Sequence, residues 1–173
     1  MKMFLISDTH FNHTNIIKYC DRPFHSAHEM NEALIYNWNS VVSENDIIYH
    51  LGDFGLGNDE QVKAITSRLN GKKILILGNH DVRRGIERWK SLGFYEVYKK
   101  EFRVGKYILT HRPIEISKDY INIFGHIHNK EPHESFNSNN HINVSVEVTN
   151  YYPIEFDEKL GIIDVNYDNK MNV

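Results

Sequence analysis

The stretch "KKILILGNHD" (72–81) begins with two lysines, continues with four apolar residues and ends in Gly-Asn-His-Asp. A fully apolar run of this length predicts a strand that is buried on both faces, as in a parallel sheet covered by helices. A glycine directly after the run lets the backbone turn sharply and come close to a bound group. In open α/β sheets, ligands bind in the crevice outside the carboxyl ends of the strands. We therefore expect an α/β fold in which functional side chains follow the strands.

The elements expected around this stretch support that fold. In the first half, strands are predicted at 2–7, 46–51 and 72–77, and helices at 25–43, 59–69 and 85–92. Ser26 and Glu29 form a capping-box pattern at the start of the first of these helices. Alternating strands and helices indicate a parallel sheet with helices packed on it. The second half is rich in strands, predicted as a hairpin within 95–111 that turns at Gly105-Lys106, followed by 120–124, 142–148 and 159–165.

These patterns predict an α/β sandwich of two sheets, the second mixed or antiparallel. A length of 173 residues, with no repeat and no long linker, predicts one domain over residues 1–173.

Carboxylate, amide and imidazole side chains follow five of the expected strands. Because His126 and His128 are two positions apart in an extended segment, they can point to one side. Imidazole with carboxylate suits a divalent first-row transition metal. Each motif alone is weak, but five of them at strand ends favour a metal site. The candidate ligands are Asp8, His10, Asp53, Asn79, His111, His126 and His128. They outnumber the ligands that one ion needs, which favours two ions roughly 3.5–4 Å apart.

Composition narrows the class of protein. The chain has 20 basic and 23 acidic residues and a net charge of −3, so tight binding to long nucleic acid is not expected. Cys20 is the single cysteine, which excludes an intramolecular disulfide and favours a cytoplasmic location; we expect it to be a small buried residue. The apolar run in "MKMFLISDTH" is too short for a signal peptide or a membrane span, so a soluble protein is expected. Nothing in the sequence indicates the oligomeric state.

The motifs "SDTH" (7–10), "GD" (52–53), "GNHD" (78–81), His111 and "GHIH" (125–128) resemble, in this order, those of the calcineurin-like metallophosphoesterases. The stretches "THFNHTNIIKYCDRPF" and "NVSVEVTNYYPI" look like a compact bacterial or phage subgroup of that family. This chain departs from the subgroup pattern at Asn12 and at Ser145-Val146-Glu147, outside the metal motifs.

The resemblance implies a four-layer αββα fold with a dinuclear metal centre at the carboxyl ends of the strands. It implies one ion on Asp8, His10, Asp53 and His128, and a second on Asp53, Asn79, His111 and His126. Manganese is the favoured metal, with iron, nickel or zinc as alternatives. A hydroxide that bridges the ions would attack phosphorus.

The remaining candidates would act on the substrate. His80 is expected to donate a proton to the leaving oxygen or to clamp a phosphoryl oxygen, and Asp81 to orient His80 or to cap a helix near Val82. His13 is expected either to contact the substrate phosphate or to support the metal ligands. Arg22 and Arg112 are candidate phosphate ligands, with ordinary surface positions as the alternative.

The other histidines and two tyrosines are expected to play structural roles. His50 is expected in the core, and His25, His28, His133 and His141 on the surface. Tyr151 and Tyr152 are expected to pack a late strand rather than to line a nucleobase pocket.

The leading hypothesis is a phosphoesterase for a small substrate, with a phosphodiester of nucleotide size favoured. A phosphomonoesterase with the same mechanism, a non-catalytic metal-binding scaffold and a nuclease on long nucleic acid are the alternatives.

Overall fold

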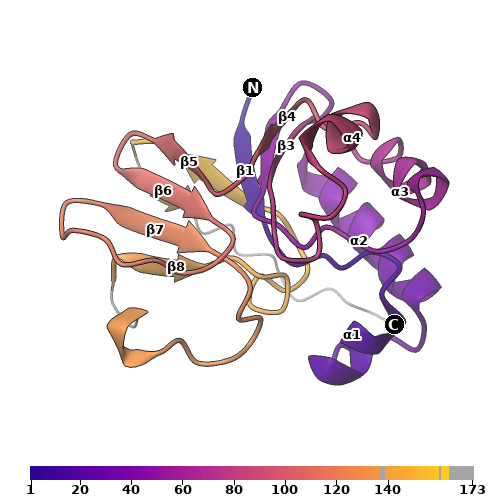
Figure 1. Cartoon of the computed structure of the whole chain (residues 1–173), viewed down its shortest axis with the longest axis horizontal. Coiled ribbons are helices and arrows are strands. Elements are labelled where there is room, and N and C mark those ends of the chain that lie inside the picture. The colour runs from indigo at the N-terminus through magenta and orange to yellow at the C-terminus, as the bar shows by residue number, and fades with distance from the viewer. Residues whose placement is uncertain (137–138, 160, 164–173) are drawn as a thin grey trace.

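Two β-sheets lie face to face in the computed structural model, which describes residues 1–136, 139–159 and 161–163 (Figure 1). The first sheet has six strands in the order β10-β9-β1-β2-β3-β4 and the second has four in the order β5-β6-β7-β8. The strands of the first sheet are β1 (Met3–Ile6), β2 (Ile47–His50), β3 (Lys72–Ile76), β4 (Glu96–Tyr98), β9 (Ile154–Asp157) and β10 (Gly161–Ile163). Those of the second are β5 (Glu101–Val104), β6 (Tyr107–Thr110), β7 (Ile121–Phe124) and β8 (His141–Asn143).

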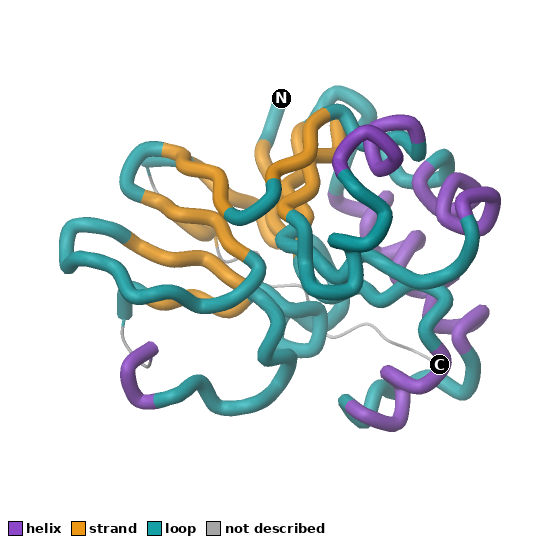
Figure 2. Tube along the Cα trace, in the orientation of Figure 1, coloured by secondary structure: helices purple, strands orange, loops and turns teal. Residues whose placement is uncertain are grey.

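Helices cover the face of the first sheet that points away from the second sheet. They are α1 (Thr14–Tyr19), α2 (Ala27–Val41), α3 (Asp59–Thr66) and α4 (Ile86–Ser91), and Figure 2 shows them in purple on one side of the orange strands. On the side of the second sheet, the described residues add the short 3₁₀ helix η1 (Glu134–Phe136). The expected two-sheet sandwich with flanking helices is confirmed, and loops supply most of the cover over the second sheet. None of the described helices has the length and apolarity needed to cross a bilayer.

The pleat of the strands divides the core in two. Phe4 and Ile6 of β1 pack into the cluster beneath the helices, whereas Leu5 between them packs into the cluster between the sheets. Ile74 and Leu75 of β3 divide in the same way, so this strand is buried on both faces, as "KKILIL" predicts.

The strands β1 to β4 are parallel, and β6 to β8 are parallel within the second sheet. The two sheets join just beyond β1 and β8, where Ser7 and Ser145 form a parallel bridge. The Ser7 N–H donates to the carbonyl oxygen of Val144, and the Ser7 carbonyl oxygen accepts from the Val146 N–H. The carboxyl ends of strands from both sheets therefore meet at one edge.

Several expected elements differ from the observed ones. Residues 96–98, expected in a hairpin, form β4 of the first sheet, and the antiparallel hairpin comprises β5 and β6. The strand expected at 142–148 ends at Asn143. Within 159–165, β10 comprises residues 161–163, Lys159 lies in a turn, and residues 160 and 164–165 lie outside the described residues. The sequence patterns missed α1, which has too few residues for a periodic signal, and β9, which follows Pro153.

Candidate metal centre

Five of the expected ligands have an unusual backbone conformation. A positive φ is uncommon outside glycine, and such residues cluster at functional sites because the surrounding structure has to hold them there. The loops at the carboxyl ends of β1, β2 and β7 therefore adopt this geometry where ligands are expected. The φ values are 59° for Asp8, 50° for His10, 55° for Asp53, 69° for His126 and 55° for His128.

The glycines in the motifs allow these loops to interlock. A Cβ atom at Gly78 would collide with the Asp53 side chain, and one at Gly125 would collide with the side chains of Ser7 and Asp8. The glycine spacers thus permit loops from different strands to approach one another without a side chain between them.

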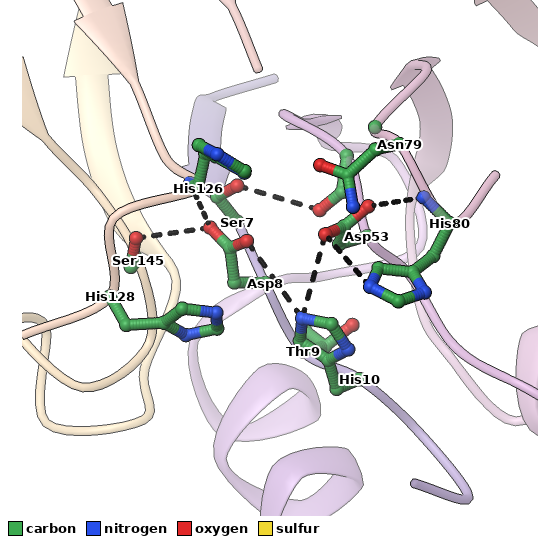
Figure 3. A network of polar contacts seen from close by, with 12 residues as sticks. Ser7, Asp8, Thr9, His10, Asp53, Asn79, His80, His126, His128 and Ser145 are labelled. Atoms are coloured by element: carbon green, nitrogen blue, oxygen red, sulfur yellow. Dashed lines mark hydrogen bonds and ion pairs between the residues drawn. The ribbon is translucent and has the colours of Figure 1, made fainter. Parts of the chain in front are cut away.

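The first group of potential ligands comprises Asp8, His10 and His128, whose candidate atoms lie within 4.8 Å of one another. Asp8 is fully buried, and its Oδ2 accepts hydrogen bonds from the His126 N–H (2.8 Å) and the Ser145 hydroxyl (3.0 Å) (Figure 3). Its Oδ1 and the His10 Nε2 are buried atoms without a hydrogen-bond partner. An uncompensated buried polar atom is costly, and a bound cation would satisfy both.

The second group comprises Asp53, His111 and His126, again within 4.8 Å. His111 Nδ1 lies 2.8 Å from the carbonyl oxygen of Leu51, which can only accept, so Nδ1 carries the proton. The other nitrogen, Nε2, then faces Asp53 Oδ2 at 3.5 Å and Asn79 Oδ1 at 3.1 Å. This hydrogen bond orients the ring with Nε2 toward the second group. Burial lowers the pKa of His111, but the hydrogen bond with Asp53 and the charges of Asp8 and Asp53 raise it above its usual value, so metal binding at Nε2 would release a proton.

Asp53 lies between the two groups. Its Oδ2 is 3.6 Å from His10 Nε2 in the first group and 3.5 Å from His111 Nε2 in the second. Its Oδ1 accepts the His80 N–H at 2.9 Å. Burial alone would raise the pKa of Asp53, but the hydrogen bond and charge of His111 hold that pKa below its usual range. The carboxylate is therefore ionised at neutral pH and lies between two groups that could each hold a cation.

The protonation of two histidines also suits metal binding. Burial lowers the pKa of His10 to about 2 and that of His126 to about 4, so both rings are neutral at neutral pH. A neutral ring nitrogen is the form that ligates a metal. Together with the unpartnered atoms of Asp8 and His10, this donor set fits two divalent cations.

Glu147 is a residue of the site whose role the sequence did not indicate. Its side chain is 3% exposed, and Oε1 lies 2.9 Å from His128 Nδ1. Burial lowers the pKa of His128, but hydrogen bonds with Cys20 and Glu147 raise it to about 10. The carboxylate orients the ring so that Nε2 remains for the first ion, and metal binding at that nitrogen would release a proton.

Arg22 is buried and paired inside the site, contrary to its candidate role as a phosphate ligand. Its side chain is fully buried, and Nη2 and Nε donate to Glu147 Oε1 at 2.6 and 2.9 Å. Nη1 and Nη2 also donate to the carbonyl oxygens of Thr9 and Asp8 at 2.9 and 2.7 Å. Arg22 therefore ties the "SDTH" loop to Glu147 instead of binding a phosphate.

Ser145 and Glu147 are two of the positions at which the chain departs from the subgroup pattern. Ser145 donates to Asp8, and Glu147 supports His128. Their departure from that pattern was a signal in the sequence, but their position outside the metal motifs did not predict that they support the ligands.

Asp81 supports the backbone of the site. Its Oδ2 accepts from the Asp53 N–H (2.7 Å) and the Gly78 N–H (2.8 Å), and its Oδ1 accepts from the Phe54 N–H (3.2 Å). Both oxygens are thus occupied by backbone donors of two motif loops, and burial raises the pKa of the carboxyl to about 7. The expected roles of orienting His80 or capping a helix at Val82 are not what this geometry shows, since α4 begins only at Ile86.

His80 and His13 line a cleft of about 470 Å³ that the ligand groups also line. The His80 side chain is 42% exposed, and its Nε2 lies 3.9 Å from Asp53 Oδ2. His13 Nδ1 is 3.2 Å from His10 Nδ1, and its ring centroid is 6.0 Å from that of His80. Arg112 is exposed, with Nη2 3.4 Å from Asn79 Oδ1.

The remaining histidines largely follow expectation. His50 is fully buried, its Nε2 2.9 Å from the Thr9 hydroxyl, and His25, His28 and His133 are exposed. His141 is half-buried rather than exposed, since it packs at β8 with its Nε2 3.0 Å from the carbonyl oxygen of Ile114. Cys20 and Tyr151 are buried, as expected.

A sandwich of two sheets with histidine and aspartate side chains at the strand ends is the arrangement expected of a metallophosphoesterase. The family model of the calcineurin-like phosphoesterases matches residues 1–164, so the protein is a member of that family. Members are generally metal-dependent hydrolases that typically bind two metals.

The chain is similar to three particular proteins. It is 42% identical over 171 residues to the uncharacterized protein MJ1445 of Methanocaldococcus jannaschii, covering 94% of this chain and 92% of that one. A crystal structure of a protein of unknown function, AQ665 from Aquifex aeolicus, has a TM-score of 0.71 and 30% identity, covering 89% of this chain and 95% of that one. The gene 66 protein of Mycobacterium phage L5 is 35% identical over 78 residues, 43% of this chain and 37% of that one.

Proposed function

We propose that the protein is a metal-dependent phosphoesterase that hydrolyses a small phosphodiester of nucleotide size. The observation that carries this proposal is the position of Asp53 Oδ2, 3.6 Å from His10 and 3.5 Å from His111, between two groups of metal-ligating atoms. Two ions held at such a site supply an activated water molecule and neutralise charge on the phosphoryl oxygens.

His80 is the residue that protonates the leaving oxygen. Its backbone N–H is fixed by Asp53 Oδ1, while its exposed ring stays in the cleft. The Nε2 atom, 3.9 Å from Asp53 Oδ2, is close enough to the ligand groups to reach an oxygen that leaves phosphorus there. A proton transferred from Nε2 would stabilise the departing alkoxide.

A small substrate suits the size and charge of the cleft. A volume of about 470 Å³ falls within the range of small-molecule sites, roughly 300–1,000 Å³. The net charge of −3 gives no broad attraction for long nucleic acid. We favour manganese as the metal, since mixed nitrogen and oxygen ligation suits it, with iron, nickel and zinc as alternatives.

The retained groups argue against a non-catalytic scaffold. The seven expected ligands are all present, and His80 occupies the cleft as a candidate acid. His80 lies beside the two ligand groups but belongs to neither of them. A non-catalytic metal-binding scaffold would have no use for a histidine in that position.

The test is hydrolysis by protein stripped with EDTA and then reloaded with manganese. The two substrates are p-nitrophenyl phosphate, a monoester, and bis(p-nitrophenyl) phosphate, a diester. We expect turnover only after metal is added, and faster turnover of the diester. Preference for the monoester would instead establish a phosphomonoesterase, and no turnover of either by metal-loaded protein would favour the scaffold.

A further inference from the structure

A second hollow adjoins the cleft of the ligand groups. It has a volume of about 460 Å³ and lies where the residues that follow β3 and β6 meet the segment that joins β4 to β5. Asn79 and His111, two expected ligands, form part of its wall, and Asn79 lines the ligand cleft as well. Because Asn79 forms a wall of both, a molecule bound in the cleft could extend past Asn79 toward this hollow.

Three cations line this hollow, which we call the basic hollow. Lys99 and Lys100 come from the segment between the sheets, and Arg112 follows His111 directly. Lys99 and Lys100 are exposed, and none of the ion pairs found among the described residues involves either of them. The carboxylate in the lining belongs to Glu101, which pairs with Arg103 at 3.0 Å. The basic hollow is thus a local concentration of positive charge on a chain whose net charge is −3.

Apolar side chains line the remainder of the basic hollow. They belong to Leu77, Val82 and Ile114. Val82 is 54% exposed, so its side chain is accessible to a ligand in the basic hollow. A surface with a small apolar platform and several cations at its rim suits a ligand that has both a flat apolar part and an anionic part.

Arg112 connects the basic hollow to the metal centre. Its Nη2 lies 3.4 Å from Asn79 Oδ1, so the guanidinium is held beside an expected ligand while it lines the hollow. A guanidinium presents several donors in a planar fork that matches the geometry of a phosphate.

The hollow on the other side of His80 is the competing place for an anion. It has a volume of about 350 Å³ and is lined by Arg83, Arg84 and Arg88. Asp59 pairs there with Arg84 at 3.1 Å and with Arg88 at 2.5 Å, which leaves less uncompensated charge than in the basic hollow.

We propose that the basic hollow binds a second phosphate on the substrate, so that the preferred substrate is a nucleotide-like diester carrying a phosphate beyond the one that reacts. This rests on the proposed function, because the reacting phosphate is placed at the ligand groups. Lys99 and Lys100 hold the second phosphate, and the nucleoside packs against Val82 and Ile114.

The experiment compares two substrates that differ only in the second phosphate. Thymidine 5′-(p-nitrophenyl phosphate) has the reacting diester alone, whereas its 3′-phosphorylated derivative has the additional group. For the native protein loaded with manganese, we expect the 3′-phosphate to lower KM about tenfold, the size expected for charge-assisted contacts at an exposed site. The advantage should shrink as salt is raised, because the lysines are exposed.

Two variants locate the effect. The double change Lys99→Gln and Lys100→Gln is expected to abolish the tenfold difference between the substrates. The matched control Arg83→Gln removes a cation in the competing hollow and is expected to preserve it. If the native protein does not distinguish the substrates, or if Arg83→Gln rather than the lysine changes removes the difference, the proposal is wrong.

A binding measurement separates this proposal from the proposed function. Calorimetric titration with thymidine 3′,5′-bisphosphate and with thymidine 5′-monophosphate reports on the second phosphate even if neither substrate is hydrolysed. Tighter binding of the bisphosphate that is lost in the lysine variant supports the proposal. Equal binding of the two nucleotides by the native protein overturns it.

Discussion

Replacement of Glu147 by glutamine tests how the chain supports its candidate metal centre. The change keeps the size of the side chain but removes the charge that Arg22 and His128 both face at 2.6 to 2.9 Å. With both partner side chains largely buried, the guanidinium of Arg22 would be left without its counter-charge. Removing one member of a buried ion pair costs roughly 3–5 kcal/mol.

The structure places the expected loss at the lower end of that range. Arg22 keeps its hydrogen bonds to the carbonyl oxygens of Asp8 and Thr9, and a glutamine oxygen can still accept from it. We therefore expect Glu147→Gln to lower the free energy of unfolding by about 3 kcal/mol. The measurement is urea unfolding of the EDTA-treated protein followed by circular dichroism.

Glu155→Gln is the matched control. Glu155 pairs with Lys2 at 2.7 Å, but the lysine side chain is 60% exposed, and such surface pairs contribute roughly 0–1 kcal/mol. If Glu147→Gln costs no more than this control, the buried pair does not stabilise the loops as we infer.

The same variant is expected to change metal binding and the response to acid. Loss of the carboxylate that orients His128 should weaken manganese binding about 10- to 100-fold, measured by calorimetry.

Burial raises the pKa of Glu147, but His128 and Arg22 lower it below its usual value of 4.5. Its contribution to stability is therefore present above pH 4.5 and lost as the pH falls through the lowered pKa, a dependence that Glu147→Gln should lack.

Three further variants address the ligands, the acid and the glycine spacers. Asp53→Asn is expected to reduce turnover more than any other single ligand change and to leave one ion or none per chain by elemental analysis, whereas the exposed control Asp119→Asn should keep both ions. His80→Ala should retain both ions but lose roughly 10²–10⁴-fold in turnover of an alkyl ester, and much less for a p-nitrophenyl ester, whose leaving group needs no proton. An equal loss for both esters would make His80 a clamp on the phosphoryl group. Gly125→Ala places a Cβ against Asp8 and should destabilise the fold by about 1–3 kcal/mol in urea unfolding, and an unchanged midpoint would contradict that close contact.

The sequence indicated which candidate ligands lie together, but it did not indicate the residues that support them, such as Glu147 and Ser145. Ligands follow the strands, and the carboxyl ends of parallel strands meet at one edge, so local patterns sufficed to bring Asp8, Asp53 and His126 together. Glu147 reaches Arg22 across 125 positions in sequence, and Ser145 reaches Asp8 across 137. No local periodicity encodes such contacts, because they arise only when two sheets join at their edges.

Local patterns also assigned some elements wrongly. The pattern of 95–98 is that of a strand, but it does not tell which sheet the strand joins, and β4 pairs with β3 rather than with β5. Arg22 reads as a surface cation until its buried partner Glu147 is known. The position of Asp81 in the sequence suggests a helix cap, yet its carboxylate accepts hydrogen bonds from the backbone N–H groups of Asp53 and Phe54 in another loop.

The most direct test of the proposed dinuclear centre is a titration of manganese into metal-free protein while turnover of bis(p-nitrophenyl) phosphate is recorded. Asp53 between two groups of ligands predicts that turnover rises until two ions are bound per chain and then becomes constant. Full turnover with one ion per chain, or turnover that does not depend on metal at all, would contradict the account.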